Sequence, residues 1–118
     1  YPPVRGLLAD PFNPADLHFG VDVLVTNDKN VNAVLDGTVL MSGYTANNGY
    51  VVVMQHTGNL VSVYRHLSSI LVREGEKVKS GEVLGTAGVQ GDKALQPYLH
   101  IELWHKGTAL DPTQYISF

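Results

Sequence analysis

The sequence predicts an all-β domain built from antiparallel sheets, with almost no helix. Polar and apolar residues alternate with period two along most segments, or gather in short β-branched runs, as they do in strands. Gly, Asn and Asp interrupt these segments at strand-like intervals. With 118 residues, of which 44% are hydrophobic and 16% charged, the chain has the size and composition of one folded domain over residues 1–118.

The expected elements follow the chain in order. The opening YPPVRG, with paired prolines and a glycine, indicates the remnant of a linker over residues 1–8. Asp36-Gly37 indicates a tight turn, and residues 56–59 indicate a hairpin loop. Strands are expected at the following positions, with short further pieces near Val72 and Val83: Val21–Thr26, Asn32–Leu35, Thr38–Tyr44, Tyr50–Gln55, Leu60–His66 and Tyr98–His105.

Two later segments complete the expected elements. Gly75, Gly81 and Gly85 punctuate a charged stretch, which favours a short hairpin or hammerhead-like turn with a solvated face. Asp111-Pro112 favours one short, peripheral helical turn, because Asp caps helix N-termini and Pro suits the first helical position.

The segment YLHIELW, from Tyr98 to Trp104, is the most informative strand for locating chemistry. Successive side chains of a strand point to opposite faces of its sheet. The apolar residues 99, 101 and 103 are therefore expected to face the core. Tyr98, His100, Glu102 and Trp104 then share the other face, as a polar and aromatic row that lines a groove.

Composition excludes several classes of function. The formal net charge of −3 and the lack of a basic patch argue against nucleic-acid binding. The chain has no cysteine, so disulfides and thiolate chemistry are excluded and any metal must be held by His, Asp or Glu. No apolar run reaches the length that a membrane-spanning helix needs.

Four scattered residues form the candidate site: His18, Asp22, His66 and His100. Two imidazoles and one carboxylate suit a zinc ion with one position left for water or substrate. A capping or solvated His–Asp pair, and a histidine that is only hydrogen-bonded on a sheet, remain the structural alternatives. Glu102 is expected either to orient a ligand or to pair with a neighbouring Arg or Lys.

The last three histidines to be placed, His56, His66 and His105, differ in their expected setting. His66 ends the strand expected at Leu60–His66 and should therefore project from a strand end. His56 lies in the expected hairpin loop, and His105 precedes another turn. Both of these are expected at the surface.

The order of short motifs resembles the lysostaphin-type, or M23, zinc metallopeptidase domain over nearly the whole chain. The motifs are HFGVD at 18–22, DGTV at 36–39, YRHL at 64–67, GEKVKSGEVLG at 75–85 and PYLHIE at 97–102. Several motifs in the right order are far more specific than any single one.

The resemblance implies roles for particular residues. His18, Asp22 and His100 would be zinc ligands, and His66 would be a catalytic histidine. Tyr98 stands where the family has the first histidine of His-x-His, so Tyr98 takes a catalytic position and weakened or specialised activity is expected. Tyr50 follows Gly49 where the family has Gly-Asn, which predicts an altered groove contact.

The resemblance also implies a setting for the domain. It implies a narrow groove over the metal, peptide bonds of bacterial peptidoglycan as substrate, and a place in the cell envelope, periplasmic or extracellular. Domains of this kind commonly follow a membrane anchor or coiled coil, so the chain is expected to be part of a longer protein whose anchor lies in a missing N-terminal region.

Three other functions stay open at this point. The second hypothesis is a catalytically inactive envelope module that binds peptidoglycan or activates a cell-wall hydrolase or divisome-type partner. Tyr98 and Tyr50 favour it, whereas the three intact ligand types favour the enzyme. A sugar-phosphotransfer IIA carrier ranks behind, because its His-Phe-Gly motif follows the Asp-Gly-Thr segment. A biotinyl or lipoyl carrier is poorer still, because Lys77 and Lys79 lack its Met-Lys-Met setting.

Overall fold

The computed structural model describes residues 1–26, 28–88 and 97–118, and within them it is an all-β structure. The strands are β1 (Gly6–Asp10), β2 (Val21–Val25), β3 (Asn30–Asn32), β4 (Gly37–Thr45), β5 (Gly49–Gln55), β6 (Leu60–Ile70), β7 (Lys77–Val78), β8 (Val83–Ala87), β9 (Tyr98–His105) and β10 (Thr108–Leu110). Three 3-10 turns are the only helical elements in these ranges: η1 (Pro14–Asp16), η2 (Thr57–Asn59) and η3 (Pro112–Gln114).

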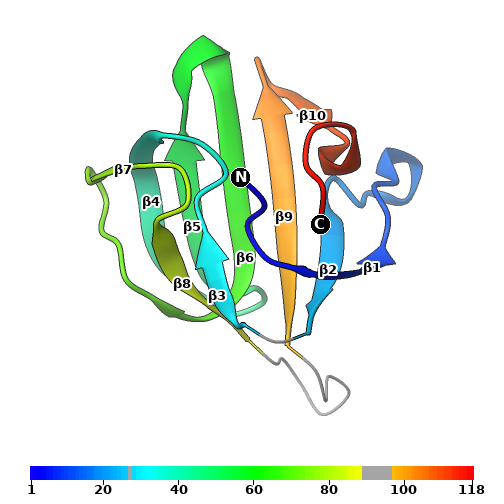
Figure 1. Ribbon diagram of the computed structural model, residues 1–118. Coiled ribbons are helices and arrows are strands. Elements are labelled where there is room, and N and C mark those ends of the chain that lie inside the picture. Colours follow the sequence, from blue (N-terminus) through cyan, green and yellow to red (C-terminus); the bar gives the residue numbers. More distant parts are fainter. Residues whose placement is uncertain (27, 89–96) are drawn as a thin grey trace.

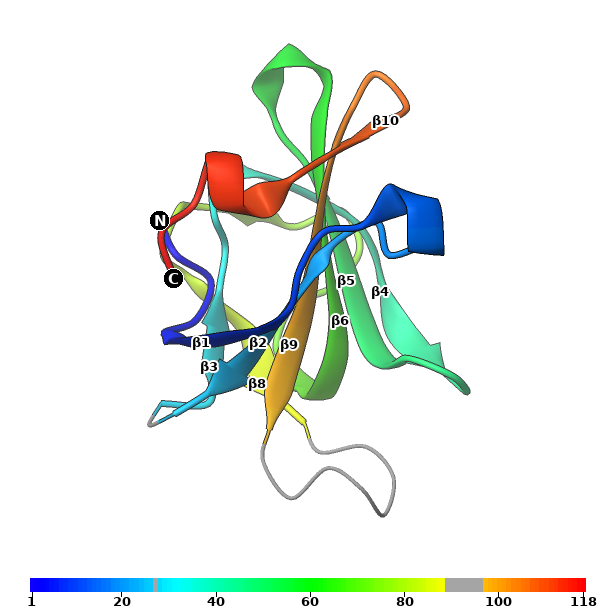
Figure 2. The ribbon, with the colours of Figure 1, turned by 90° about the vertical axis from the view of Figure 1, so that its right-hand side faces the viewer.

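All strand pairs are antiparallel, and the main path through the sheet runs β1-β2-β9-β6-β5-β4-β7. β10 pairs with β9, and β8 pairs with both β3 and β6. Figure 1 shows β9, β6, β5 and β4 side by side, and Figures 1 and 2 both show the two ends of the chain close together. The expected all-β, antiparallel fold is confirmed.

β9 lies between β2 and β6 and provides a rigid platform for the candidate site. Leu99, Ile101 and Leu103 are buried in the core, as the alternation predicts. The largest fully buried side chains elsewhere include Tyr64, Met54 and Leu84. Burying an apolar side chain of this size stabilises the fold by about 1.5–3 kcal/mol.

Most expected strands are present, but two differ from the prediction. β6 continues past His66 to Ile70, because its last residues pair with β8. The strand expected at Asn32–Leu35 is wrong beyond Asn32: β3 ends there, and the following residues form a bend. The Asp36-Gly37 turn therefore does not close a hairpin, since β3 pairs with β8 and not with β4.

The charged stretch is also arranged differently from the prediction. β7 pairs with β4, and β8 pairs with β3 and β6, so the two do not form a hairpin with each other. Val83 begins β8, as expected, whereas Val72 is a buried residue outside any strand. The helical turn after Asp111 is confirmed as η3, where the Thr113 amide donates to Asp111 Oδ1 at 3.0 Å.

Residues 1–8, expected as a linker remnant, are largely part of the fold. Pro3 and Val4 are buried, and Gly6 begins β1. The Asn32 amide donates to the Pro3 carbonyl at 2.8 Å, which ties this segment to β3. Paired prolines favour extended backbone, and here that extended backbone packs against the core.

No helix in the described ranges is long and apolar enough to cross a membrane.

Candidate metal centre

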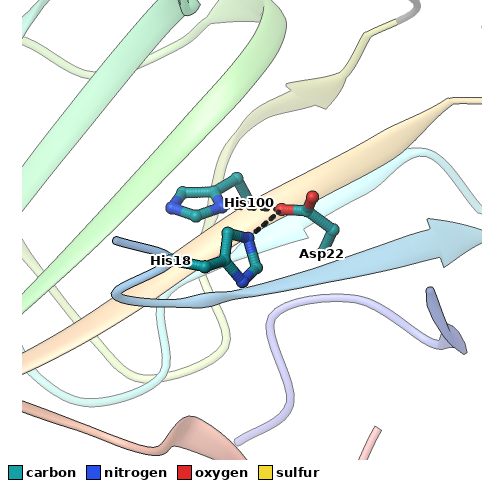
Figure 3. A group of neighbouring side chains, drawn as sticks. All are labelled: His18, Asp22 and His100. Carbon is teal, nitrogen blue, oxygen red and sulfur yellow. Dashed lines mark hydrogen bonds and ion pairs between the residues drawn. The ribbon is translucent and has the colours of Figure 1, made fainter. Parts of the chain in front are cut away.

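Three of the expected site residues come together in space although they are far apart in sequence. Asp22 on β2 is the direct cross-strand partner of His100 on β9, so their side chains share one face of the sheet. His18 precedes β2. One possible ligand atom from each of His18, Asp22 and His100 lies within 4.8 Å of the other two. Figure 3 shows the three side chains pointing toward one another.

Local structure holds His18 toward this group. The Asn13 amide donates to the His18 carbonyl and the His18 amide to the Asn13 carbonyl, both at 2.9 Å, which closes the loop around η1. Gly20 then lets the chain pass very close to β9: a Cβ there would lie 2.3 Å from the Ile101 carbonyl oxygen. The Gly in HFGVD is therefore required for the approach of His18 to His100.

One ring nitrogen of His18 is hydrogen-bonded and the other is not, among the described residues. Its Nδ1 lies 2.6 Å from the Pro11 carbonyl, which only accepts, so Nδ1 carries the proton. Nε2 is buried and has no hydrogen-bond partner among the described residues. It lies 3.5 Å from Asp22 Oδ1. A buried, unpaired lone pair that faces a carboxylate fits a metal ligand, because leaving it unsatisfied destabilises the fold by about 1–3 kcal/mol.

His100 is held between two carboxylates. Its Nδ1 donates to Asp22 Oδ1 at 2.6 Å, and its Nε2 donates to Glu102 Oε2 at 2.8 Å. Burial alone would lower the pKa of His100, but the hydrogen bonds and charges of Asp22 and Glu102 outweigh it and raise that pKa to about 9. In the metal-free state His100 is therefore protonated at neutral pH, and a cation must displace that proton.

Glu102 is placed for both roles that the sequence left open. It is only 9% exposed, its Oε1 accepts from Trp104 Nε1 at 2.8 Å, and Arg65 Nε lies 3.4 Å from its Oε2. Burial would raise its pKa, but hydrogen bonds from His100 and Trp104 and the nearby positive charges lower it. Glu102 is thus a carboxylate that fixes the orientation of the His100 ring.

The pKa of Asp22 is lowered in the same way. Burial works against the charged form, but the hydrogen bond and charge of His100, together with the nearby His18, outweigh it. The three candidate ligands therefore combine one ionised carboxylate with two imidazoles, which is a donor set that binds zinc.

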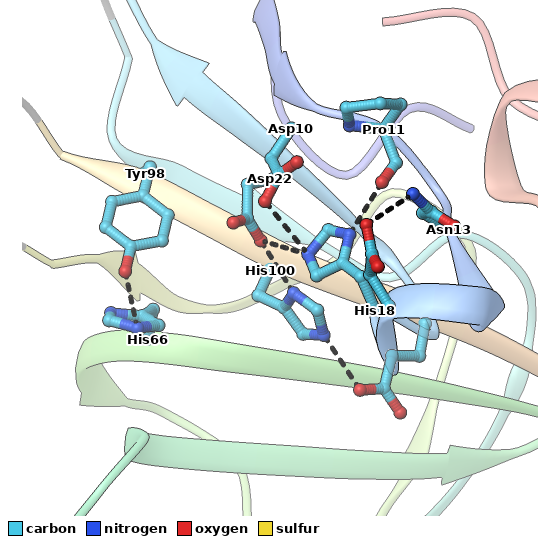
Figure 4. A network of polar contacts seen from close by, with 10 residues as sticks. Asp10, Pro11, Asn13, His18, Asp22, His66, Tyr98 and His100 are labelled. Carbon is cyan, nitrogen blue, oxygen red and sulfur yellow. Dashed lines mark hydrogen bonds and ion pairs between the residues drawn. The ribbon is translucent and has the colours of Figure 1, made fainter.

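His66 and Tyr98 form a second pair close to this cluster. The Tyr98 hydroxyl lies 2.7 Å from His66 Nε2, and the two ring centroids are 4.2 Å apart. Figure 4 shows the Tyr98 hydroxyl pointing toward the His66 ring. Burial lowers the pKa of His66, and burial together with the charge of Asp22 raises the pKa of Tyr98. The imidazole is therefore neutral and the phenol protonated near neutral pH. In the tautomer with its proton on Nδ1, the phenol donates to Nε2 and occupies the lone pair of that nitrogen.

The backbone at His66 differs from the prediction. His66 does not end its strand; it sits inside β6 at an irregularity in the pairing with β5, with a φ of 71°. Positive φ is uncommon for a residue other than glycine, and such conformations concentrate at functional sites. Two backbone hydrogen bonds of 2.8 Å hold it there, from the His66 amide to Asn48 and from the Gly88 amide to the His66 carbonyl.

A groove of about 210 Å³ opens beside His66. It is lined by Tyr44, Gly49, Tyr50, His66, Leu67, Ser68 and Gly88. Tyr50 contacts Tyr44 edge-on, with ring centroids 5.3 Å apart, and Tyr44 is 68% exposed. Tyr50 thus lines this groove, and its role in contacting a substrate stays a prediction.

Two side chains differ from the prediction made from the sequence: His56 was expected elsewhere, and Asp10 had no predicted role. His56, expected at the surface, is 5% exposed: its Nδ1 lies 2.7 Å from the Asp36 carbonyl oxygen, and its Nε2 lies 2.7 Å from Ser62 Oγ. His105 is exposed, as expected. Asp10 was not singled out, yet its Oδ2 lies 3.7 Å from His18 Nε2. The position of Asp10 beside His18 follows from the pairing of β1 with β2, and no spacing in the sequence predicts it.

An antiparallel β-sheet thus presents a candidate metal-binding group of two imidazoles and one carboxylate. The profile of peptidase family M23 matches residues 16–112, and the chain belongs to this family. The resemblance drawn from the motifs is thereby confirmed.

Curated relatives are similar over nearly the whole chain. The murein hydrolase activator NlpD of Escherichia coli is 29% identical over 117 residues, which cover 97% of this chain and 30% of that protein. The peptidoglycan DD-endopeptidase ShyC of Vibrio cholerae is 34% identical over 110 residues, which cover 86% and 25%. The chain spans about a third or less of the length of these relatives.

Solved structures share the fold. A zinc-containing peptidase from Vibrio cholerae superposes with a TM-score of 0.78 at 27% identity, over 93% of this chain and 37% of that one. The catalytic domain of lysostaphin from Staphylococcus simulans gives a TM-score of 0.72 at 26% identity, over 94% and 88%. The lysostaphin-type fold is thus shared at domain level.

Proposed function

We propose that this domain binds zinc through His18, Asp22 and His100 and acts on the peptides of bacterial peptidoglycan as an endopeptidase of reduced activity. One observation carries the proposal: the buried, unpaired Nε2 of His18 faces Asp22, whose carboxylate also contacts His100. When bound, zinc would supply a Lewis acid that activates water and polarises a peptide carbonyl.

The protein's own groups supply the remaining chemistry. His66 is the candidate general base, since burial lowers its pKa and leaves a neutral imidazole that can accept a proton at neutral pH. The Tyr98 hydroxyl lies 2.7 Å from His66 Nε2, the nitrogen that would take that proton in the tautomer protonated at Nδ1. Tyr98 is a weak base, but its hydroxyl can donate to a developing oxyanion. We therefore expect slow hydrolysis, because Tyr98 must leave His66 before His66 can act.

The substrate is proposed from the groove and from the relatives. The Tyr44–Tyr50 pair beside His66 offers aromatic faces to an extended peptide. ShyC is named a peptidoglycan DD-endopeptidase, which supports peptidoglycan peptides as the substrate class. We accordingly place the domain in the bacterial cell envelope, periplasmic or extracellular.

Digestion of isolated peptidoglycan tests this function. The purified chain is loaded with zinc, its metal content is measured by emission spectroscopy, and soluble fragments are identified by chromatography and mass spectrometry. We expect one zinc per chain and slow release of peptide fragments that a chelator stops. Asp22→Ala should lose the metal, and His66→Ala should keep the metal but lose the release. A metal-free chain would contradict the proposal.

A second candidate is an inactive envelope module that activates a separate cell-wall hydrolase or serves a divisome-type partner. Two observations favour it: the Tyr98 hydroxyl contacts His66 Nε2, and the similar protein NlpD is named a murein hydrolase activator. Zinc binding without cleavage, together with faster peptidoglycan digestion when the chain is added to a hydrolase from the same cell, would support this candidate over the peptidase.

A further inference from the structure

A β-bulge at the end of β1 brings a second carboxylate to the candidate metal centre. β1 pairs with β2 in regular register up to Leu8↔Val23, and then the register shifts so that Asp10 is the partner of Asp22. Without this extra residue, Ala9 would lie opposite Asp22. Bulges re-aim side chains in this way and are common next to active sites.

The bulge therefore determines which side chain shares the face of Asp22. Cross-strand partners in an antiparallel pair present their side chains on the same face. Figure 4 shows the Asp10 carboxylate on the side of His18, close to Asp22. His18 Nε2 lies 3.5 Å from Asp22 Oδ1 and 3.7 Å from Asp10 Oδ2, so the unpaired nitrogen faces two carboxylates.

These separations fit two ligands of one ion. Ligand atoms at about 2.0–2.2 Å from a tetrahedral zinc stand about 3.4 Å from one another. The distances from His18 Nε2 to both carboxylates are already close to this value. The third contact, His100 Nδ1 to Asp22 Oδ1, is a hydrogen bond of 2.6 Å and would have to open by about 0.8 Å when a cation replaces the proton.

The two carboxylates differ in exposure and in how they are held. The Asp22 side chain is 22% exposed and is held by His100, whereas the Asp10 side chain is 60% exposed. An exposed carboxylate can swing toward or away from an ion with little rearrangement of the sheet. Asp10 is therefore suited to be an exchangeable ligand rather than a fixed one.

We propose that Asp10 is a fourth protein ligand of the divalent cation, which closes the coordination position that water or substrate would use. This inference rests on the proposed zinc centre. In its closed form the centre has four protein ligands, like structural zinc sites, and is latent. Release of Asp10 opens it. A domain with such a ligand keeps its metal while it is inactive, which suits both a slow peptidase and an activator module.

Metal binding by the purified chain tests this inference with readouts other than activity. The proteins compared are the unchanged chain, Asp10→Asn, Asp22→Asn and the control Glu74→Gln. Glu74 is an exposed acid before β7, at the opposite edge of the sheet, and its substitution changes the net charge equally. Zinc affinity is measured by competition with a chromophoric chelator at 0.1 M and 1 M NaCl. Azide is titrated into the cobalt-loaded proteins and followed by visible absorption.

Asp10→Asn should weaken zinc binding about 10- to 100-fold at both salt concentrations, while Glu74→Gln leaves it unchanged. Azide should perturb the cobalt spectrum of Asp10→Asn at concentrations at least tenfold lower than in the unchanged chain, because the fourth position is open. Thermal melting of each metal-free variant checks that it folds.

Three results would overturn the role of Asp10: an affinity equal to that of Glu74→Gln, a loss that disappears at 1 M NaCl, or equal azide binding by Asp10→Asn and the unchanged chain. A loss that disappears at 1 M NaCl would mean that Asp10 affects zinc binding only through its charge and does not coordinate the ion. Failure of the zinc centre itself is distinguishable, because then the unchanged chain takes up no metal and Asp22→Asn makes no difference, and this inference falls with it.

Discussion

Replacing Tyr98 with His should increase hydrolysis of peptidoglycan peptides. In the present chain the Tyr98 hydroxyl lies 2.7 Å from His66 Nε2 and uses the lone pair that a general base needs. Tyr98→His removes this donor and supplies a second imidazole on the same face as His100. A positioned acid–base group typically contributes a factor of about 10²–10⁴, which corresponds to about 2.7–5.5 kcal/mol in activation free energy.

The assay is the initial rate of soluble fragment release from peptidoglycan by zinc-loaded protein. Tyr98→Phe is the matched control, because it removes the hydroxyl without adding a base. We expect at least a 100-fold gain for Tyr98→His and less than a tenfold change for Tyr98→Phe. The lost hydrogen bond should reduce stability by only about 1 kcal/mol. An unchanged rate in Tyr98→His, with zinc content and melting temperature preserved, would refute this account of Tyr98.

Three further predictions concern the metal centre and the core. Glu102→Gln should weaken zinc binding about 10- to 100-fold in chelator competition, because the Glu102 carboxylate orients His100. The pKa of His100 is raised to about 9, so zinc binding at pH 7.5 should release about one proton, and zinc affinity should rise roughly tenfold per pH unit below pH 9. Calorimetry in buffers of different ionisation enthalpy measures both quantities. A flat affinity between pH 6.5 and 8.5 would contradict this. Tyr64→Phe should lower the free energy of unfolding in urea by about 1–3 kcal/mol, because the Val34 amide donates to the Tyr64 hydroxyl, whereas Tyr44→Phe at an exposed position should change it by less than about 0.5 kcal/mol.

The alternation along β9 shows what local sequence can predict. Strict period two placed His100 and Glu102 on one face and Ile101 on the other, and this holds because both neighbouring strands fix the register of β9. The same argument fails for residues 1–8. Paired prolines are typical of a linker sequence. Only contacts with β3 and the core make this segment, including Val4, part of the domain.

The candidate site was predictable to a different degree for each residue. His18 and Asp22 belong to one short motif, so local structure already brings these two residues close to each other. The position of Asp10 depends on a bulge, and a bulge is fixed by strand pairing rather than by any residue type. The positive φ of His66 likewise arises from the irregular pairing of β6 with β5.

His56 illustrates a third limit. Its hairpin-loop position predicted exposure, but its two ring nitrogens are bonded to the Asp36 carbonyl and to Ser62 inside the domain. Ser62 Oγ in turn lies 2.8 Å from the Tyr64 hydroxyl. A buried histidine is tolerated when each polar atom has a partner, and those partners come from segments that the local sequence does not connect.

An anomalous-diffraction map at the zinc edge, from crystals of this chain grown with zinc, tests the central claim most directly. The account predicts one peak at about 2.0–2.2 Å from His18 Nε2, Asp22 Oδ1 and His100 Nδ1 together. A zinc-exposed crystal with no peak there, or with the three side chains turned away from one another, would contradict it.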